Sequence, residues 1–420
     1  MCGIVGILGR EPVAGRIVDA LKRLEYRGYD SAGVATLDDG RLSRRRAEGK
    51  LRNLETRLSK EPLSGVVGIG HTRWATHGKP TETNAHPHST RRLALVHNGI
   101  FENFRELRDE LAAAGHAFET ETDTEVAAHL VTGHLDAGMA PRAAVAAAAK
   151  RLRGAYALVF LFAGAQETLI GVCHGAPLAV GYGADELYLG SDALALAPFT
   201  DDIAYLRDGD VAELTRSGVA MTDFDGRPLS RRRERSAASA LLVDRGNHRH
   251  FMAKEIHEQP EVVGRTIAHY VDMSAGLTKM PFAWPVAPAN LKRVLIVACG
   301  TAHYAGLAGK IWIERFARLP VEIDVASEFR YRDAPMGEGD LVIVVSQSGE
   351  TADTLASLRH ARSKGAKALG IVNVPTSTIA RECDALAPTL AGPEIGVAST
   401  KAFTCQLAAL ASIAIALGRA

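Results

Sequence analysis

The first eight residues, Met1-Cys2-Gly3-Ile4-Val5-Gly6-Ile7-Leu8, decide how the N-terminal part of the chain is built. The apolar run over residues 3–8 predicts a strand that is buried on both faces. Cys2 directly follows the initiator methionine, and removal of Met1 would leave a thiol and a free α-amino group on one residue. The thiol is a nucleophile once deprotonated, and the amine, with a reference pKa of about 7.7–8.0, can act as its base. A cysteine at position 2 can equally be an ordinary residue without a catalytic role, so the other motifs of the chain must decide between the two interpretations.

Composition and charge restrict the class of protein. A length of 420 residues predicts two or three domains, and 47% apolar residues suit globular cores. The formal net charge of +1 gives no electrostatic footprint for nucleic acid. No run of 18 apolar residues and no signal peptide are found, so no membrane partner is expected. The five cysteines are scattered, which favours a reducing cytoplasm: Cys2, Cys173, Cys299, Cys383 and Cys405.

The pattern of apolar residues divides the chain. Many short strands and a few helices predict an α+β domain rich in antiparallel strands over residues 2–240. A polar stretch follows, and we place the linker at 241–255. From Lys292, strands alternate with helices, which predicts an α/β domain with a parallel sheet over 256–420.

Four residues near predicted strand ends or helix starts could act on one amide substrate. Arg73 can grip a carboxylate with two parallel hydrogen bonds, and Asp123 can pair with an ammonium group. Asn98 and Gly99 can donate a side-chain and a backbone N–H to an oxyanion. Each also has a purely structural interpretation: a surface ion pair for Arg73, a helix cap for Asp123 and a hairpin turn for Asn98 with Gly99. Their occurrence together with Cys2 favours glutamine hydrolysis.

Five motifs of this part resemble the N-terminal-nucleophile glutamine amidotransferases, at residues 1–6, 26–33, 71–78, 97–100 and 122–125. The resemblance implies sandwiched antiparallel sheets. It also implies a nucleophile, Cys2, and an oxyanion hole made by Asn98 and Gly99. The implied glutamine-binding residues are Arg73, Trp74, Thr76, His77 and Asp123, with Trp74 on a loop that closes over glutamine.

Several histidines raise a metal alternative: His71, His77, His86, His88 and His97. Their spacings match no familiar zinc pattern, and no cysteine lies among them, so hydrogen bonding within loops is favoured. No metal, flavin or pyridoxal cofactor is expected.

Hydroxyl-rich loops follow strands in the second domain. Residues 346–351 lie between a strand and a helix, where a helix N-terminus favours an anion such as phosphate. The sequence is neither a Walker motif nor a GxGxxG motif. These loops resemble the sugar isomerase (SIS) domain, which implies the sugar-phosphate-binding residues Thr301, Ser346, Gln347, Ser348, Thr351, Val397 and Ser399. Ala302 departs from the serine usual in that family.

The order of the two domains resembles enzymes that make glucosamine 6-phosphate and glutamate from fructose 6-phosphate and glutamine. The resemblance implies a Cys2 thioester, transferred ammonia and a homodimer formed through SIS domains. Such enzymes have a second SIS domain with acid/base residues, and these 420 residues contain one. We therefore expect glutamine hydrolysis and little amino sugar from this chain. Two alternatives stay open: a sugar-phosphate-binding protein without synthase activity, and an amidotransferase for another sugar-phosphate acceptor.

Overall fold

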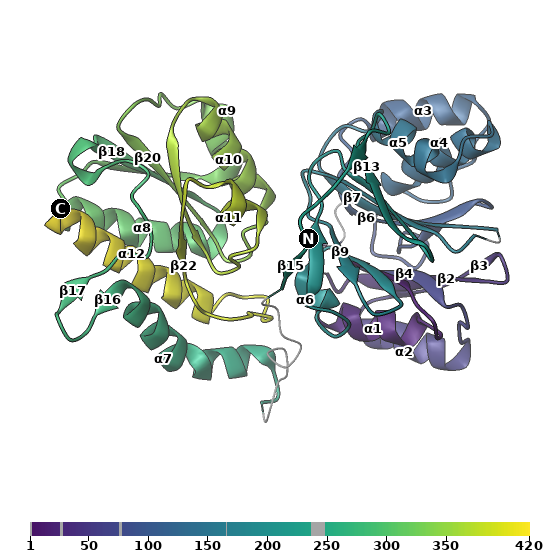
Figure 1. The fold of residues 1–420 in the computed structure, drawn as a ribbon, viewed down its shortest axis with the longest axis horizontal. Helices are drawn as coiled ribbons and strands as arrows, with labels where there is room; N and C mark the ends of the chain where they lie inside the picture. Colours follow the sequence, from purple (N-terminus) through teal and green to yellow (C-terminus); the bar gives the residue numbers. More distant parts are fainter. Residues whose placement is uncertain (1, 26–27, 75–77, 165, 237–247) are drawn as a thin grey trace. The chain divides into compact units, whose positions relative to one another are not determined.

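The computed structural model describes residues 2–25, 28–74, 78–164, 166–236 and 248–420. The chain forms two compact units, Met1–Leu241 and Leu242–Ala420, which we describe separately (Figure 1).

Unit 1 contains two antiparallel sheets. In the described residues the first sheet has eight strands in the order β15-β11-β9-β10-β1-β4-β2-β3. Its strands are β1 Gly3–Leu8, β2 Ser31–Asp38, β3 Arg41–Glu48, β4 Val67–Arg73, β9 Ala179–Tyr182, β10 Leu187–Gly190, β11 Asp202–Tyr205 and β15 Glu234–Arg235. The second sheet has seven described strands in the order β14-β13-β12-β8-β7-β6-β5. They are β5 His88–Ser89, β6 Leu93–Gly99, β7 Tyr156–Phe162, β8 Leu169–His174, β12 Val211–Thr215, β13 Gly218–Thr222 and β14 Pro228–Leu229.

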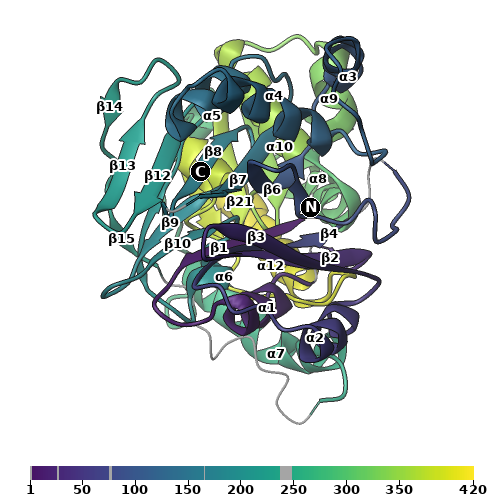
Figure 2. The same ribbon diagram turned by 90° about the vertical axis from the view of Figure 1, so that its right-hand side faces the viewer.

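Helices cover the outer face of each sheet of unit 1 (Figures 1 and 2). The first sheet is covered by α1 Ala14–Lys22, α2 Leu51–Lys60 and the short α6 Ala193–Leu196. The second sheet is covered by α3 Phe104–Ala113, α4 Thr124–Asp136 and α5 Pro141–Ala149. The result is a helix–sheet–sheet–helix sandwich, as the resemblance implied.

Strand β1 lies in the middle of the first sheet and is buried on both faces. Ile4 and Leu8 pack between the two sheets, whereas Val5 and Ile7 pack under α1. This two-sided burial explains why the predicted strand reads as a continuous apolar run rather than as an alternating pattern. It also fixes Cys2, one residue before the strand.

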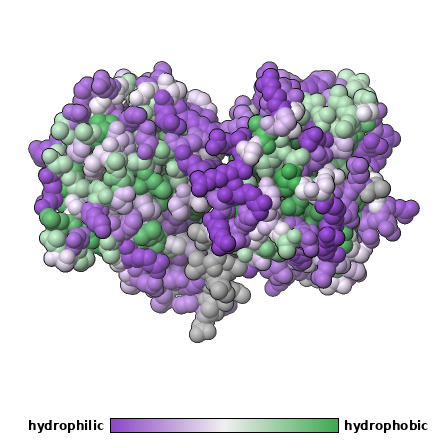
Figure 3. All heavy atoms as spheres, in the orientation of Figure 1, coloured by the Kyte–Doolittle hydropathy of each residue, from purple (hydrophilic) through white to green (hydrophobic). Residues whose placement is uncertain are grey.

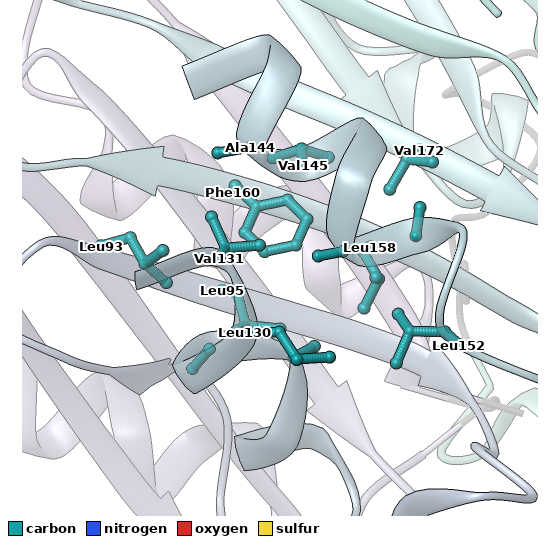
Figure 4. Close-up of a cluster of buried hydrophobic side chains, with 14 of the residues drawn as sticks. Leu93, Leu95, Leu130, Val131, Ala144, Val145, Leu152, Leu158, Phe160 and Val172 are labelled. Carbon is teal, nitrogen blue, oxygen red and sulfur yellow. The ribbon is translucent and has the colours of Figure 1, made fainter. Parts of the chain in front are cut away.

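The core under α4 and α5 anchors the strand that carries Asn98. Leu95 of β6, Phe160 of β7 and Val131 of α4 belong to this buried cluster, which Figure 4 shows in close-up. Leu95 and Phe160 are also register partners on neighbouring strands. The C-terminal end of β6 is therefore held against α4.

Unit 2 is an α/β domain. Its parallel sheet has the order β19-β18-β20-β21-β22, with β18 Arg293–Ala298, β19 Val321–Val325, β20 Asp340–Ser346, β21 Lys367–Val372 and β22 Ala385–Pro388. One face packs on α7 Phe251–Tyr270, α8 Gly300–Phe316 and α12 Lys401–Arg419, and the other on α9 Ala326–Arg332, α10 Ala352–Ser363 and α11 Thr378–Glu382. The remaining elements are the hairpin of β16 Val271–Asp272 with β17 Leu277–Thr278 and the 3-10 turn η3 Pro288–Asn290. The predicted fold class, α+β followed by α/β, is confirmed.

Helix α12 is long and apolar enough to cross a membrane by length and composition. However, 61% of its most apolar 18-residue window is buried, where it packs against α7 and α8 inside unit 2. This helix is therefore a core helix of unit 2. Apolar residues are also found on the surface of both units, as the space-filling view shows (Figure 3).

The stretch around the expected linker is more structured than its polar composition suggested. Arg231 forms a two-pronged ion pair with the buried Asp210, at 2.6 Å for both bonds, so it belongs to unit 1. Strand β15 then pairs with β11. Helix α7 begins at Phe251, inside the stretch 241–255, because Glu255 is buried among partners in unit 2. The linker expected at 241–255 thus overlaps the first turn of a helix.

Candidate active site

Cys2 lies where β1 begins beside the end of β4. The two strands are antiparallel, with Gly3 opposite Thr72, so Cys2 lies next to the chain that follows Arg73. The backbone N–H of Trp74 donates to the Cys2 sulfur at 3.4 Å, and the thiol lies 3.7 Å from the Trp74 carbonyl oxygen. The partly buried sulfur is thus held by one strand end.

Asn98 approaches Cys2 from the other sheet. Its side-chain oxygen Oδ1 accepts a hydrogen bond from the backbone N–H of Cys2 at 3.3 Å. Its amide nitrogen Nδ2 is buried and has no hydrogen-bond partner among the described residues. A buried amide donor without a partner carries a desolvation cost, and such a group beside a nucleophile is suited to receive a developing oxyanion.

Gly99 has a conformation that side chains rarely adopt. Its φ is +135°, and a Cβ atom built on it would lie 2.0 Å from the carbonyl oxygen of Ala155. Only glycine fits against β7 at this point, so the backbone following Asn98 is fixed by close packing. The hairpin-turn interpretation of Asn98 and Gly99 is wrong, because both residues belong to strand β6.

Arg73 and Asp123 are the charged residues of this site, with exposed fractions of 4% and 5%. Arg73 donates to the carbonyl oxygens of Gly78 and Lys79 at 3.4 and 3.3 Å. Asp123 precedes α4 but makes no helix-capping hydrogen bond; its carboxylate accepts from the backbone N–H of Phe101 at 2.9 Å. Asp123 therefore does not cap the helix, as its structural interpretation expected, but binds the backbone of Phe101, two residues after Gly99.

The charges around Cys2 act in both directions. Burial raises the pKa of the Cys2 thiol; the hydrogen bond with Trp74 and the charge of Arg73 lower it, and the charge of Asp123 raises it. Burial also lowers the pKa of Arg73. Because burial dominates at Cys2, the resting group is a thiol, and attack requires a base to remove its proton.

The remaining residues assigned to this pocket are Trp74, Thr76 and His77. Trp74 is 39% exposed, and its ring meets that of Tyr29 edge-to-face at 5.4 Å. Thr76 and His77 lie outside the described residues, so their assignment stays a prediction. Within the described part of the chain, no three His, Cys, Asp or Glu side chains are arranged to hold a metal ion.

The hydroxyl-rich loops of unit 2 gather at the carboxyl ends of β18 and β20. The next strand after β18 lies on one side of it and β20 lies on the other, so these ends flank a topological switch point, where α/β sheets bind ligands. Thr301 lies at the start of α8, and Thr351 precedes α10. Ser346 Oγ lies 2.9 Å from Thr351 Oγ1 and accepts from the N–H of Gly349 at 3.0 Å.

Two further residues of this loop, Ser348 and Gln347, pair with backbone N–H groups. Ser348 Oγ accepts from the N–H of Glu350 at 3.1 Å, and the backbone carbonyl oxygen of Gln347 accepts from the N–H of Asn373 at 3.2 Å. The loop is therefore held in shape by its own hydrogen bonds.

Two buried carboxylates, which the sequence interpretation missed, hold the segment with Val397 and Ser399. Glu394 accepts from Ser399 Oγ at 2.9 Å and from the N–H groups of Thr400 and Ala402, at the start of α12. Glu255 of α7 accepts from the N–H groups of Ile395 and Gly396. Val397 remains 64% exposed between these anchors. No sequence signal links Glu255 to a segment 140 residues away.

Protein-family profiles match both units. The profile described as a glutamine amidotransferase domain matches residues 71–198, and the SIS domain profile matches residues 289–416. The fold and the two sets of loops thus define a class of protein in which a glutamine amidotransferase domain precedes a sugar isomerase domain.

Similar proteins narrow this class to one family. A glutamine–fructose-6-phosphate aminotransferase (isomerizing) of Bradyrhizobium diazoefficiens is 64% identical over 420 residues, covering 100% of this chain and 69% of that protein. The Brucella suis protein of the same name is 62% identical, with the same coverage. The solved C-terminal domain of the Francisella tularensis enzyme is 43% identical over 42% of this chain and 49% of that chain, with a TM-score of 0.40. The chain belongs to the glutamine–fructose-6-phosphate aminotransferase family, whose members are class II glutamine amidotransferases.

Proposed function

We propose that this protein hydrolyses glutamine through a Cys2 thioester and delivers the ammonia to fructose 6-phosphate, giving glucosamine 6-phosphate and glutamate. The observation that carries the proposal is the pairing of Cys2 with Asn98. The Asn98 side chain bonds the backbone of the residue that carries the thiol, and its buried Nδ2–H has no partner among the described residues; a nucleophile and an unpaired donor in one place are what amide hydrolysis through an oxyanion needs.

In the proposed reaction each residue has one role. Once Met1 is removed, the α-amino group of Cys2 takes the thiol proton, and the thiolate attacks the glutamine side-chain carbonyl. Asn98 Nδ2 and the Gly99 N–H stabilise the oxyanion, ammonia leaves with the proton, and water then releases glutamate. Arg73 binds the substrate carboxylate and Asp123 its ammonium group, with Trp74, Thr76 and His77 bordering the pocket.

Unit 2 would bind the sugar phosphate. The hydroxyls and amides of Thr301, Ser346, Gln347, Ser348 and Thr351 would hold the phosphate, with Val397 and Ser399 beside the sugar. Support comes from their position at the switch point of the parallel sheet and at helix N-termini. We assign residues 2–240 to the amidotransferase domain and 256–420 to the SIS domain.

A homodimer through the SIS domains is the proposed assembly. Tyr304, Leu307 and Ile311 lie at helical spacing along α8 and are 63%, 39% and 61% exposed. An exposed apolar stripe on a helix is typical of an interaction surface. Light scattering should give the mass of a dimer, and Ile311→Glu should give that of a monomer.

The reaction is tested by incubating the 420-residue chain with both substrates and assaying glutamate and amino sugar separately. We expect glutamate release, with little amino sugar from this length of chain because an acid/base pair is not evident in the switch-point loops. Absence of glutamate from a chain verified to start at Cys2 would contradict the proposal.

A further inference from the structure

Four buried histidines of unit 1 lie together beside the segments that carry Asn98 and Asp123. This histidine quartet comprises His71 of β4, His86, His88 of β5 and His97 of β6, and each is at most 4% exposed. The rings of His71 and His86 stack at 4.2 Å between centroids. Burial lowers the pKa of His71 and His86 well below the ordinary value and that of His88 to about 3, so these rings are neutral at physiological pH.

Neutral rings have one N–H each, and their partners determine which nitrogen carries it. The backbone N–H of His97 donates to His86 Nδ1 at 3.3 Å, so the His86 proton must be on Nε2. His86 Nε2 lies 3.2 Å from Thr124 Oγ1 and therefore donates to it. Thr124 Oγ1 also bonds His97 Nδ1, at 2.9 Å, so one hydroxyl lies between the two rings. His71 Nε2 contacts the His97 carbonyl oxygen at 2.9 Å, so that nitrogen also carries its proton.

A second chain of hydrogen bonds ends at Glu125. The Thr120 hydroxyl donates to the Glu125 carboxylate at 2.7 Å, so it can only accept from Thr122 Oγ1, 3.0 Å away. Thr122 Oγ1 in turn accepts from His88 Nε2 at 3.0 Å. Burial alone would raise the pKa of Glu125, but His129, the N–H of Glu119 and the N–H and hydroxyl of Thr120 lower it to about 2. The Glu125 carboxylate, which can only accept, thus determines which atom donates in each hydrogen bond of this chain.

The first chain links the two halves of the glutamine site through the Thr124 hydroxyl, in addition to the bond from the Phe101 N–H to Asp123. Thr124 directly follows Asp123, and His97 directly precedes Asn98. We propose that Thr124 is a positioning residue for glutamine hydrolysis: its hydroxyl, between His86 and His97, holds Asp123 in register with Asn98. The proposal rests on the proposed function and adds a residue that does not touch glutamine.

The test compares three variants of one helix. Thr124→Val keeps the shape but removes the hydroxyl, and Thr124→Ser keeps the hydroxyl. Thr132→Val is the matched control, because the buried Thr132 hydroxyl of the same α4 bonds only Thr90 Oγ1 among the described contacts, 2.7 Å away. Loss of a buried hydrogen bond that leaves a histidine nitrogen unpaired predicts for Thr124→Val a KM for glutamine about tenfold higher and a kcat about tenfold lower. The other two variants should stay within about threefold of wild type.

The outcomes separate positioning from a merely structural role and from failure of the proposed function. If Thr124 only stabilised the fold, Thr124→Val would lower kcat in proportion to the folded fraction, measured by circular dichroism, and leave KM unchanged; that result would overturn the proposal. A wild-type chain that releases no glutamate would instead contradict the proposed function.

A second measurement does not depend on activity. Long-range ¹H–¹⁵N correlation spectra of histidine-labelled protein should show His71, His86 and His88 as neutral Nε2–H tautomers at neutral pH. In Thr124→Val the signals of His86 and His97 should shift, while that of His88 should not. An Nδ1–H tautomer at His86 would break the chain and overturn the proposal.

Discussion

The two sites of this protein are built in opposite ways. The polar side chains of the amidotransferase site are buried at strand ends: Arg73, Asn98 and Asp123 are 4–5% exposed and bonded to neighbouring backbone or to Cys2. The sugar-phosphate loops of unit 2 lie mostly at helix starts and are more open: Thr301 and Val397 are exposed, most of the other residues are partly buried, and Ser346 at the end of β20 is buried. A buried and fixed set of donors costs no rearrangement during reaction, which suits bond breaking, whereas exposed hydroxyls at helix N-termini suit binding of an anion. Single substitutions should therefore cost more in unit 1.

The largest effect among these substitutions is expected at the oxyanion position. Asn98→Ala removes the buried Nδ2 donor beside Cys2 and should lower kcat for glutamine hydrolysis about 10²–10³-fold, measured by glutamate release. Asn103→Ala is the matched control, because among the described residues that amide bonds the backbone of Arg151 and Arg153 in a neighbouring loop, away from Cys2. Equal activities of the two variants would place the oxyanion elsewhere.

Arg73 comes next. Arg73→Ala should raise the KM for glutamine by the equivalent of about 2–3 kcal/mol, since it loses a two-pronged bond to the substrate carboxylate. Arg73→Lys keeps the charge without the fork and should lie between Arg73→Ala and wild type. An unchanged KM in steady-state assays of Arg73→Ala would place Arg73 outside the pocket.

A smaller effect is expected in the exposed loops of unit 2. Thr301→Ala should weaken binding of fructose 6-phosphate about fivefold, measured by calorimetry, because one of several hydroxyls is lost at an exposed position at the start of α8. Ser363→Ala, which removes a hydroxyl at the far end of α10, should leave affinity unchanged. A loss of affinity as large as the about 10²–10³-fold loss of kcat expected for Asn98→Ala would contradict the difference proposed between the two sites.

The smallest effect concerns acid stability of unit 1. Glu125 has its pKa lowered to about 2 from an ordinary 4.5, so its contribution is present above about pH 4.5 and lost as pH falls toward 2. Glu125→Gln should lower the melting temperature of unit 1 by about 2–4 °C or more at neutral pH, and the difference from wild type should shrink near pH 3. A difference in melting temperature that stays constant with pH in calorimetry would show that the charge of Glu125 does not stabilise unit 1.

The sequence predicted the parts of the fold that depend on local pattern. The strand over residues 3–8 and the parallel sheet of unit 2 follow from uninterrupted apolar runs, which predict burial on both faces. Helix α5 was not expected, because its alanine-rich sequence has no polar face to give a helical period.

The candidate site was predicted only in part. Residues near strand ends were found because strand ends meet at one edge of a sheet. The sequence did not predict the hydrogen bonds that join distant segments, because no local pattern encodes how such segments pair. These bonds are those of Asp123 to Phe101, of Thr124 to His86 and His97, and of Glu255 to Ile395. The metal alternative for the histidines arose for the same reason. The spacing of histidines in the sequence does not show that their ring nitrogens bond threonine hydroxyls in the fold.

The central claim is that Cys2 is the nucleophile and Asn98 its oxyanion partner. Acid quenching of a reaction with glutamine, followed by mass spectrometry of the digested protein, tests this most directly. We expect a γ-glutamyl adduct on the N-terminal peptide that begins with Cys2, absent in Cys2→Ser and in protein that keeps Met1. An adduct on Cys173, Cys299, Cys383 or Cys405, or glutamate release by Cys2→Ser at the wild-type rate, would contradict it.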